Sequence, residues 1–159
     1  MEFSTRRLIP SAEEVFAVFQ VLEMMHFEIG QATLDKERAL HEIESAAAAG
    51  VAWGAFADGR IVGTLGLWPK SQWWYSHDEA YFSKWLYVLP DFRKGGKVLR
   101  ILLDEVIDMV DTERLPTFVH VHNTMARKMS ASRRLHMIAD EIGVFPSGRV
   151  LAFHAKKAA

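Results

Sequence analysis

The 159-residue sequence contains no cysteine, which excludes disulfide bonds, thiolate metal ligands and a cysteine nucleophile. It has no excess of either charge: 19 lysines and arginines balance 20 aspartates and glutamates, for a formal net charge of -1. This balance argues against general nucleic-acid binding. Long apolar runs are also missing. The longest weakly polar stretch, residues 45–57, is shorter than the roughly 18 residues that a membrane span needs.

The first residues, MEFSTRR, contain no apolar segment of the kind found in a secretory signal peptide. We therefore expect a cytoplasmic protein that makes no contact with a membrane. Half of the residues are hydrophobic, enough for a sizeable core. The length suits one compact domain over residues 1–159, and the sequence shows no internal repeat or linker.

The N-terminal part of the sequence predicts one strand and two helices. Residues 2–9 are consistent with a short strand. Ser11 is a good N-cap, and Glu14 three residues later completes the signature of a capping box. Apolar residues at helical spacing follow as far as Gly30. A second helix is expected over residues 35–48.

A β-hairpin and a long connection come next. Asp58 and Gly59 form a dipeptide preferred in two-residue hairpin turns, because both residues tolerate a positive φ. The apolar runs on either side, residues 51–57 and 60–68, are therefore predicted to be antiparallel strands. Residues 69–78 show no clear period and are predicted to be a loop.

The C-terminal half alternates strands and helices. A strand is predicted over residues 79–89, and a helix begins after the Gly-Gly pair at 95–96. Residues 117–122 alternate like a half-buried strand, and a helix over 123–141 and a strand over 150–154 complete the chain. The crossover between the fourth and fifth predicted strands suits a parallel pair. The expected fold is therefore α/β, with a mixed sheet and flanking helices.

The segment most informative about chemistry is LYVLPDFRKGGKVLRILL, at residues 86–103. A strand runs into a glycine-containing turn that opens a helix, where backbone N–H groups point outward with partial positive charge. Arg93, Lys94 and Lys97 add positive charge there. Such a turn can cradle a phosphate or pyrophosphate, although an ordinary strand–helix connection is the alternative. The spacings of a Walker loop and of a dinucleotide-binding G-x-G-x-x-G turn are both absent.

This segment resembles motif A of the GNAT N-acetyltransferase superfamily, whose core pattern is Arg/Gln-x-x-Gly-x-Gly/Ala. Arg93 and Gly96 match the pattern, whereas Val98 stands where glycine or alanine is usual. The order of elements around the motif also fits, so the resemblance covers nearly the whole chain. It implies a single acyltransferase domain with a mostly antiparallel sheet, in which the fourth and fifth strands splay apart.

The resemblance further implies acetyl-CoA, or another acyl-CoA, as cosubstrate and no metal. The backbone of Leu86 and Val88 would pair with the pantetheine arm and the acetyl carbonyl, in a slot between the strands that hold Val88 and Val121. Backbone amides of the turn would hold the pyrophosphate. Arg127 would meet the 3′-phosphate, unless its helix face is simply solvated. The full expected cofactor set is Leu86, Tyr87, Val88, Arg93, Lys94, Gly95, Gly96, Lys97, Val98, Asn123 and Arg127.

Two catalytic residues common among GNAT relatives are missing. Ser130 stands in place of a tyrosine that acts as general acid, and Phe82 stands in place of a glutamate base. Because acetyl transfer needs a neutral amine, some group must take a proton from the acceptor. Glu79, His120 and His122 are the candidate bases, and Ser130 is a candidate hydrogen-bond partner for the departing sulfur. The alternative is that these are ordinary core, edge or loop residues.

Residues expected on the acceptor side come from two segments. His26 and Glu28 lie near the end of the first helix, unless they are simply polar surface residues. The loop adds Trp73, Trp74 and Tyr75, which could enclose a cationic or apolar acceptor, pack in a homodimer or cap the core. Acidic and aromatic residues near this end hint at a positively charged amine.

The main hypothesis is an acyl-CoA-dependent N-acyltransferase, in which a small-molecule or protein amine attacks the thioester directly. The alternative is a non-catalytic module that binds acyl-CoA or a partner, because the usual tyrosine and glutamate are missing. A third hypothesis is nucleic-acid binding through basic residues of the last helix, which the net charge opposes. Those residues are Arg127, Lys128, Arg133 and Arg134.

Overall fold

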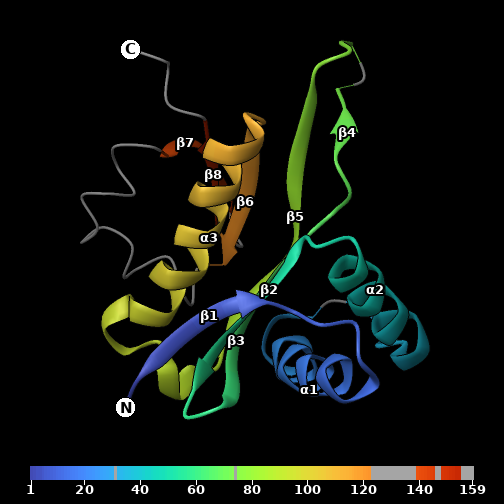
Figure 1. The fold of residues 1–159 in the computed structure, drawn as a ribbon, viewed down its shortest axis with the longest axis vertical. Coiled ribbons are helices and arrows are strands. Elements are labelled where there is room, and N and C mark those ends of the chain that lie inside the picture. The colour runs from blue at the N-terminus through green and yellow to red at the C-terminus, as the bar shows by residue number, and fades with distance from the viewer. Residues whose placement is uncertain (31, 74, 123–138, 146–147, 155–159) are drawn as a thin grey trace.

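The computed structural model describes residues 1–30, 32–73, 75–122, 139–145 and 148–154. Its strands form one sheet in the order β1-β2-β3-β5-β6-β8-β7, and β4 pairs with β5 (Figure 1). The elements are β1 (Phe3–Arg7), α1 (Ala12–Ile29), α2 (Lys36–Ala48), β2 (Ala52–Ala57), β3 (Arg60–Leu67), β4 (Ser71–Gln72), β5 (Glu79–Val88), two single 3₁₀ turns (Pro90–Phe92 and Lys94–Gly96), α3 (Lys97–Glu113), β6 (Thr117–His122), β7 (Ala139–Phe145) and β8 (Gly148–Phe153).

The sheet is mixed and mostly antiparallel, as predicted, and β5 with β6 forms its parallel pair. Helices α1 and α2 cover one face, and α3 covers the other (Figure 1). The core fills both spaces with large side chains that are almost completely buried, among them Trp53, Leu65, Tyr87, Leu102 and Phe153.

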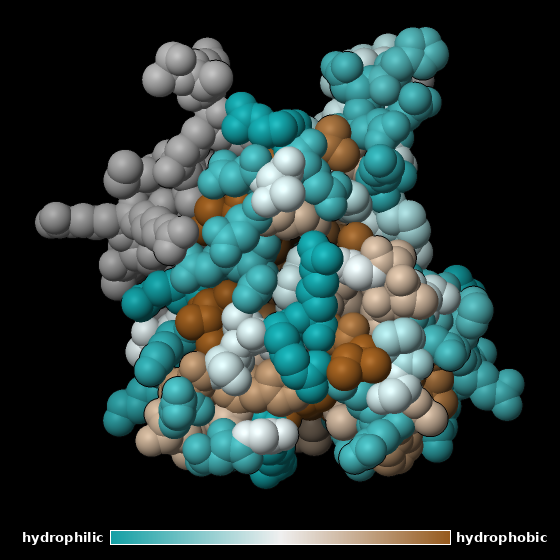
Figure 2. Space-filling view, in the orientation of Figure 1, coloured by the Kyte–Doolittle hydropathy of each residue, from teal (hydrophilic) through white to brown (hydrophobic). Residues whose placement is uncertain are grey.

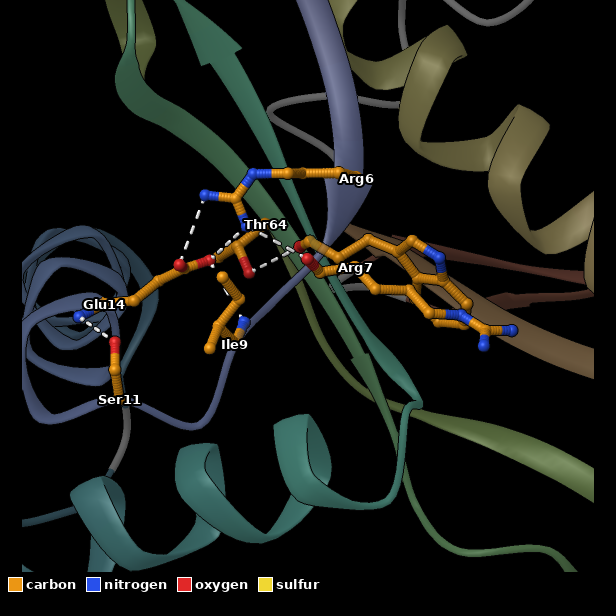
Figure 3. Close-up of polar contacts among 7 residues, drawn as sticks. Arg6, Arg7, Ile9, Ser11, Glu14 and Thr64 are labelled. Atoms are coloured by element: carbon orange, nitrogen blue, oxygen red, sulfur yellow. Dashed lines mark hydrogen bonds and ion pairs between the residues drawn. The ribbon is translucent and has the colours of Figure 1, made fainter.

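The start of α1 is fixed by the residues that the sequence indicated, with one difference. The Ser11 hydroxyl accepts the Glu14 backbone N–H at 3.3 Å, as an N-cap does. The Glu14 carboxylate, however, accepts the backbone N–H of Ile9 at 3.3 Å and pairs with Arg6 at 2.8 Å (Figure 3). The predicted capping box is therefore formed on one side only, and Glu14 ties α1 to β1.

The predicted hairpin between β2 and β3 is confirmed. Asp58 and Gly59 have φ values of 48° and 82°, the left-handed pair that this turn requires. The strand after it, β5, is the fourth strand of the sequence prediction, because the short β4 was not predicted. Ser71 and Gln72 of β4 pair with the first residues of β5 inside the predicted loop.

A β-bulge interrupts β5. Gly66 of β3 pairs with Trp85, but Leu67, the next residue on β3, pairs with Ser83. Lys84 is therefore an extra residue on β5 and has no partner in the ladder. A bulge bends its strand and increases the local twist, so β5 changes direction at Lys84.

Trp85 fixes the geometry of this bulge. Its ring lies against Gly66, where an added Cβ would come within 2.3 Å of the indole. The indole N–H donates to the buried hydroxyl of Thr64 at 3.1 Å, and that hydroxyl donates to the Trp53 carbonyl at 3.0 Å. Both polar groups are thus satisfied inside the core.

The parallel pairing of β5 with β6 is short. It consists of Tyr81 with Thr117 and Phe82 with Phe118 over these two described strands. One residue later, the Ser83 hydroxyl accepts the backbone N–H of His120 at 2.9 Å, and the bulge then carries β5 away from β6. The predicted splay between the fourth and fifth strands is therefore present.

One prediction for the C-terminal part is wrong. The end of the helix predicted over residues 123–141 is a strand, because β7 begins at Ala139 and pairs antiparallel with β8. Pairing with β8 outweighs the weak strand preference of the residues that open β7. Residues 123–138 lie outside the described residues. The last predicted strand is confirmed as β8, which begins two residues earlier, at Gly148.

We predict that Gly66→Ala destabilises the fold by about 2 kcal/mol, because its methyl group would overlap the buried Trp85 ring. Urea unfolding with tryptophan fluorescence measures this difference. Gly59→Asn is the control: asparagine tolerates a positive φ, and no atom lies within 4 Å of the added Cβ. Equal stability of the two variants would contradict the proposed role of Trp85 in fixing the bulge.

Candidate functional site

A cavity of about 210 Å³ opens where β5 and β6 diverge. Helix α1 closes one side of it, and polar side chains from both strands face into it. We call this cavity the cleft. Its lining residues are Met25, Ile29, Ser83, Lys84, Trp85, Leu86, His120 and His122.

The turn after β5 has the backbone that its glycines suggested. Gly95 and Gly96 both lie in the left-handed region, with φ values of 76° and 67°. Helix α3 begins directly afterwards at Lys97, and no side chain in the described part of the chain caps its first turn. The first N–H groups of α3 are thus available to an anionic ligand at the C-terminal end of β5.

The Arg93 side chain turns back into the protein. Its Nε–H donates to the Val88 carbonyl at 2.8 Å, and its two terminal nitrogens bind the Glu28 carboxylate at 2.8 and 2.7 Å. The Tyr87 hydroxyl donates to the same carboxylate at 2.5 Å. The sequence suggested Glu28 for the acceptor side and Arg93 for the phosphate turn, yet the structure joins them. No local signal could have found a pair 65 residues apart.

These contacts fix the charge states of the cluster. Hydrogen bonding from Arg93, with further help from Tyr87, outweighs partial burial and lowers the pKa of Glu28 to about 2. Burial, followed by the hydrogen bond to Glu28, raises the pKa of Tyr87 to about 12. A carboxylate with a depressed pKa stabilises the fold at neutral pH, and this contribution disappears as the pH falls from about 4.5 toward 2. Glu28 therefore acts as a permanent anion and not as a base.

The two candidate histidines lie together in the cleft. His120 and His122 alternate with buried residues on β6, so both point to the same face of the sheet, where they line the cleft. Burial lowers the pKa of His120, and the nearby His122 lowers it further. His120 is thus mainly neutral at pH 7, the protonation state that a general base needs.

A second, larger cavity of about 450 Å³ lies between α1, α2 and β5. It shares Met25, Ile29, Lys84 and Trp85 with the cleft, so the two cavities meet at the bulge. His26, near the end of α1, is one of its lining residues. We call this larger cavity the second cavity. Its lining residues are Leu22, Met25, His26, Ile29, Gly30, Leu34, Arg38, Ala39, Glu42, Ile43, Trp68, Lys84 and Trp85.

Lys84, the bulge residue, carries a charge into both cavities. Its ammonium pairs with Glu42 of α2 and lies over the Trp68 ring, 4.0 Å from the centroid. The hydrogen bond from Lys84 lowers the pKa of Glu42, so this carboxylate is ionised at neutral pH. No local sequence signal points to Lys84, because the bulge is set by the register of β5 with β3.

Other predicted site residues lie away from the cleft. Glu79 pairs with Lys70 at 3.5 Å at the start of β5, nine residues and about 30 Å from Val88. Trp73 packs against Phe82 and Phe118, with centroid distances of 5.4 and 5.3 Å. Tyr75 stacks on Trp73 and is 68% exposed. Trp74, Asn123, Arg127 and Ser130 lie outside the described residues.

Glu79, Trp73 and Tyr75 belong to an arm formed by β4 and the first half of β5. The arm projects from the body of the molecule, and hydrophilic residues cover its tip in the space-filling view (Figure 2). Glu79 therefore lies on the arm, paired with Lys70 and away from His120 and His122, the other two candidate bases, whereas Trp73 packs against Phe118, two residues before His120 on β6.

The described residues form neither a cluster of metal ligands nor a membrane-spanning helix. No three histidine, aspartate or glutamate side chains within the described ranges gather as metal ligands. In the same ranges, no helix is both long and apolar enough to cross a bilayer.

Comparison with solved structures identifies the fold. A GNAT-family acetyltransferase from Staphylococcus aureus Mu50 is 16% identical, with a TM-score of 0.67 over 98% of this chain and 100% of that one. The PaiA N-acetyltransferase of Thermoplasma acidophilum, in complex with coenzyme A, is 17% identical, with a TM-score of 0.59 over 97% and 99%. Arabidopsis thaliana NAA60, with a bisubstrate analogue, is 15% identical, with a TM-score of 0.63 over 99% and 100%.

No curated protein matches the sequence. The family model described as acetyltransferase (GNAT) family does match it, over residues 16–134. That range contains the splayed strands, the Gly-Gly turn and helix α3, on which the geometry of the cleft depends. The chain belongs to the GNAT family of acetyltransferases.

Proposed function

We propose that this protein is an acetyl-CoA-dependent N-acyltransferase, one domain over residues 1–159, that acts in the cytoplasm. The observation that carries the proposal is the arrangement of the cleft. It lies where β5 and β6 diverge, the uncapped glycine turn follows the C-terminal end of β5, and at the bulge the cleft meets a second cavity large enough for an acceptor. The coenzyme A complex of the Thermoplasma protein and the bisubstrate complex of the Arabidopsis protein support a ligand of this class.

The residues around the turn fit a coenzyme A ligand. Two successive residues with positive φ leave the backbone open to a pyrophosphate, and Lys94 and Lys97 add positive charge. Beyond the bulge, Leu86 lines the cleft on the part of β5 that has left β6, and we propose that an extended pantetheine arm pairs with the backbone there and at Val88, whose carbonyl already accepts Arg93 Nε–H. Asn123 and Arg127 remain proposed contacts. The Arg93 side chain positions the turn, since Glu28 already occupies its guanidinium.

The chemistry proposed for the site is direct transfer. Bound acetyl-CoA supplies a thioester carbon to the acceptor amine, whose attack forms a C–N bond and breaks the C–S bond. His120 takes the proton that the amine must lose, with His122 beside it. A backbone N–H of β5 polarises the carbonyl, as in an oxyanion hole. Ser130 remains the proposed hydrogen-bond partner of the departing sulfur.

A non-catalytic acyl-CoA-binding module is the second candidate function. Phe82, at the position of the usual glutamate base, packs between aromatic rings and has no acid–base capacity. This candidate predicts binding of acetyl-CoA without release of thiol in the presence of any amine. The transferase predicts thiol release that depends on the amine.

We predict that Gly95→Ala weakens acetyl-CoA binding about tenfold in isothermal titration, since a methyl group at the turn hinders close approach of the pyrophosphate. Gly59→Ala is a matched control. Its φ of 82° resembles the 76° of Gly95, and no atom lies within 4 Å of either added Cβ. The two variants should lose similar stability, but only Gly95→Ala should lose affinity. Equal affinities would argue against phosphate binding at the turn.

We predict that His120→Gln lowers kcat/KM by roughly 10²-fold, the usual contribution of a general base. Wild-type kcat/KM should rise with pH through an inflection below the ordinary histidine pKa of 6.5, because burial lowers the pKa of His120. The variant should lack that inflection and keep the separate inflection that comes from deprotonation of the acceptor amine. His77→Gln, on the arm, is the control and should leave the profile unchanged. An unaltered profile in His120→Gln would remove His120 from the mechanism.

A further inference from the structure

The lining of the second cavity limits which acceptor amines can bind there. Most of its wall is apolar and includes the side chains of two tryptophans, Trp68 and Trp85. A cavity of about 450 Å³ can hold an aromatic or large aliphatic group. The larger apolar side chains on this wall include Leu22, Met25, Leu34, Ile43, Trp68 and Trp85.

The charges on the wall leave a net positive site. Lys84 and Glu42 neutralise each other as an ion pair. Arg38 lies one helical turn before Glu42 on α2 and its charge helps to lower the pKa of that carboxylate, but among the described residues no ion pair joins its guanidinium to a carboxylate. Arg38 also lies in the first turn of α2, where the helix dipole favours an anion. Asp35, which caps this helix by accepting the Arg38 N–H, is not among the lining residues.

This balance disfavours amines that carry several positive charges. A second ammonium group in the cavity would lie near Arg38 or Lys84 without an unpaired carboxylate among the described lining residues. The sequence-based hint of a positively charged acceptor depended on Glu79 and the aromatic loop, which both lie on the arm. The Lys84 ammonium favours the neutral, reactive form of an amine placed beside it.

We propose that the acceptor is an α-amino acid with a large apolar or aromatic side chain, whose carboxylate binds Arg38. The proposal rests on the proposed function. The side chain fills the apolar part of the cavity, and the amine points past Lys84 into the cleft. The nitrogen loses one proton to His120 and forms a C–N bond to the acetyl carbon. The C–S bond breaks, and the released thiolate takes up a proton to leave coenzyme A and an N-acetyl amino acid.

Thiol release from acetyl-CoA by the full chain tests the proposal. L-phenylalanine, L-phenylalaninamide and spermidine serve as acceptors. We expect kcat/KM for L-phenylalanine to exceed that for the amide by about tenfold, the effect of one charge-assisted contact, and spermidine to be the poorest. Arg38→Gln should abolish the preference, mainly through a higher KM for L-phenylalanine. Arg60→Gln, an exposed arginine on β3, is the control and should keep it.

A binding measurement separates this inference from the proposed function. Trp68 and Trp85 line the cavity, so tryptophan fluorescence reports ligands in it. N-acetyl-L-phenylalanine should bind about tenfold more tightly than its amide, and Arg38→Gln should remove the difference. Selective binding without thiol release from any amine would overturn the transferase but support the recognition site. Thiol release with equal use of acid and amide, or with spermidine preferred, would overturn the inference and support the transferase.

Discussion

The cleft exists because only two residue pairs join β5 to β6. A parallel ladder that continued along both strands would fill the space with backbone hydrogen bonds. It stops because β5 carries one extra residue at Lys84, and a bulge bends the strand that contains it. Trp85 holds the bulge in place by packing on Gly66 and bonding to Thr64. A side-chain contact inside the sheet thus determines whether a ligand can enter it.

The contact between Arg93 and Glu28 has a corresponding role at the C-terminal end of β5. It joins the glycine turn, the last residues of β5 and the end of α1 in one cluster. Because the Arg93 side chain is only 13% exposed, this pair is less screened by solvent than an ordinary surface ion pair. The motif arginine therefore orients the backbone that faces the phosphates, while the backbone itself provides the donors.

Local signals in the sequence predicted local structure well. Ser11, the Asp58-Gly59 turn and the Gly-Gly pair each specify a backbone conformation within a few residues, and each is present as predicted. The placement of side chains at the site depended on contacts between distant segments. The bulge at Lys84 follows from register with β3, and the partner of Arg93 comes from α1. Glu79 lies at the start of β5 and pairs with Lys70, a placement that sequence spacing could not give because it does not show which end of a long strand faces the cleft.

The short parallel pairing of β5 with β6, which we call the seam, also has a mechanical consequence. It divides the sheet into two parts, β1–β5 and β6–β8, that share little backbone hydrogen bonding. Helix α3 packs against β1, β2 and β3 on one side of the seam and against β8 on the other. It therefore contacts both parts of the sheet and holds them together. Parts joined in this way can unfold as separate cooperative units. An extended ligand paired to the open edge of β5 completes the missing ladder, so binding and rigidity of the sheet are thermodynamically coupled.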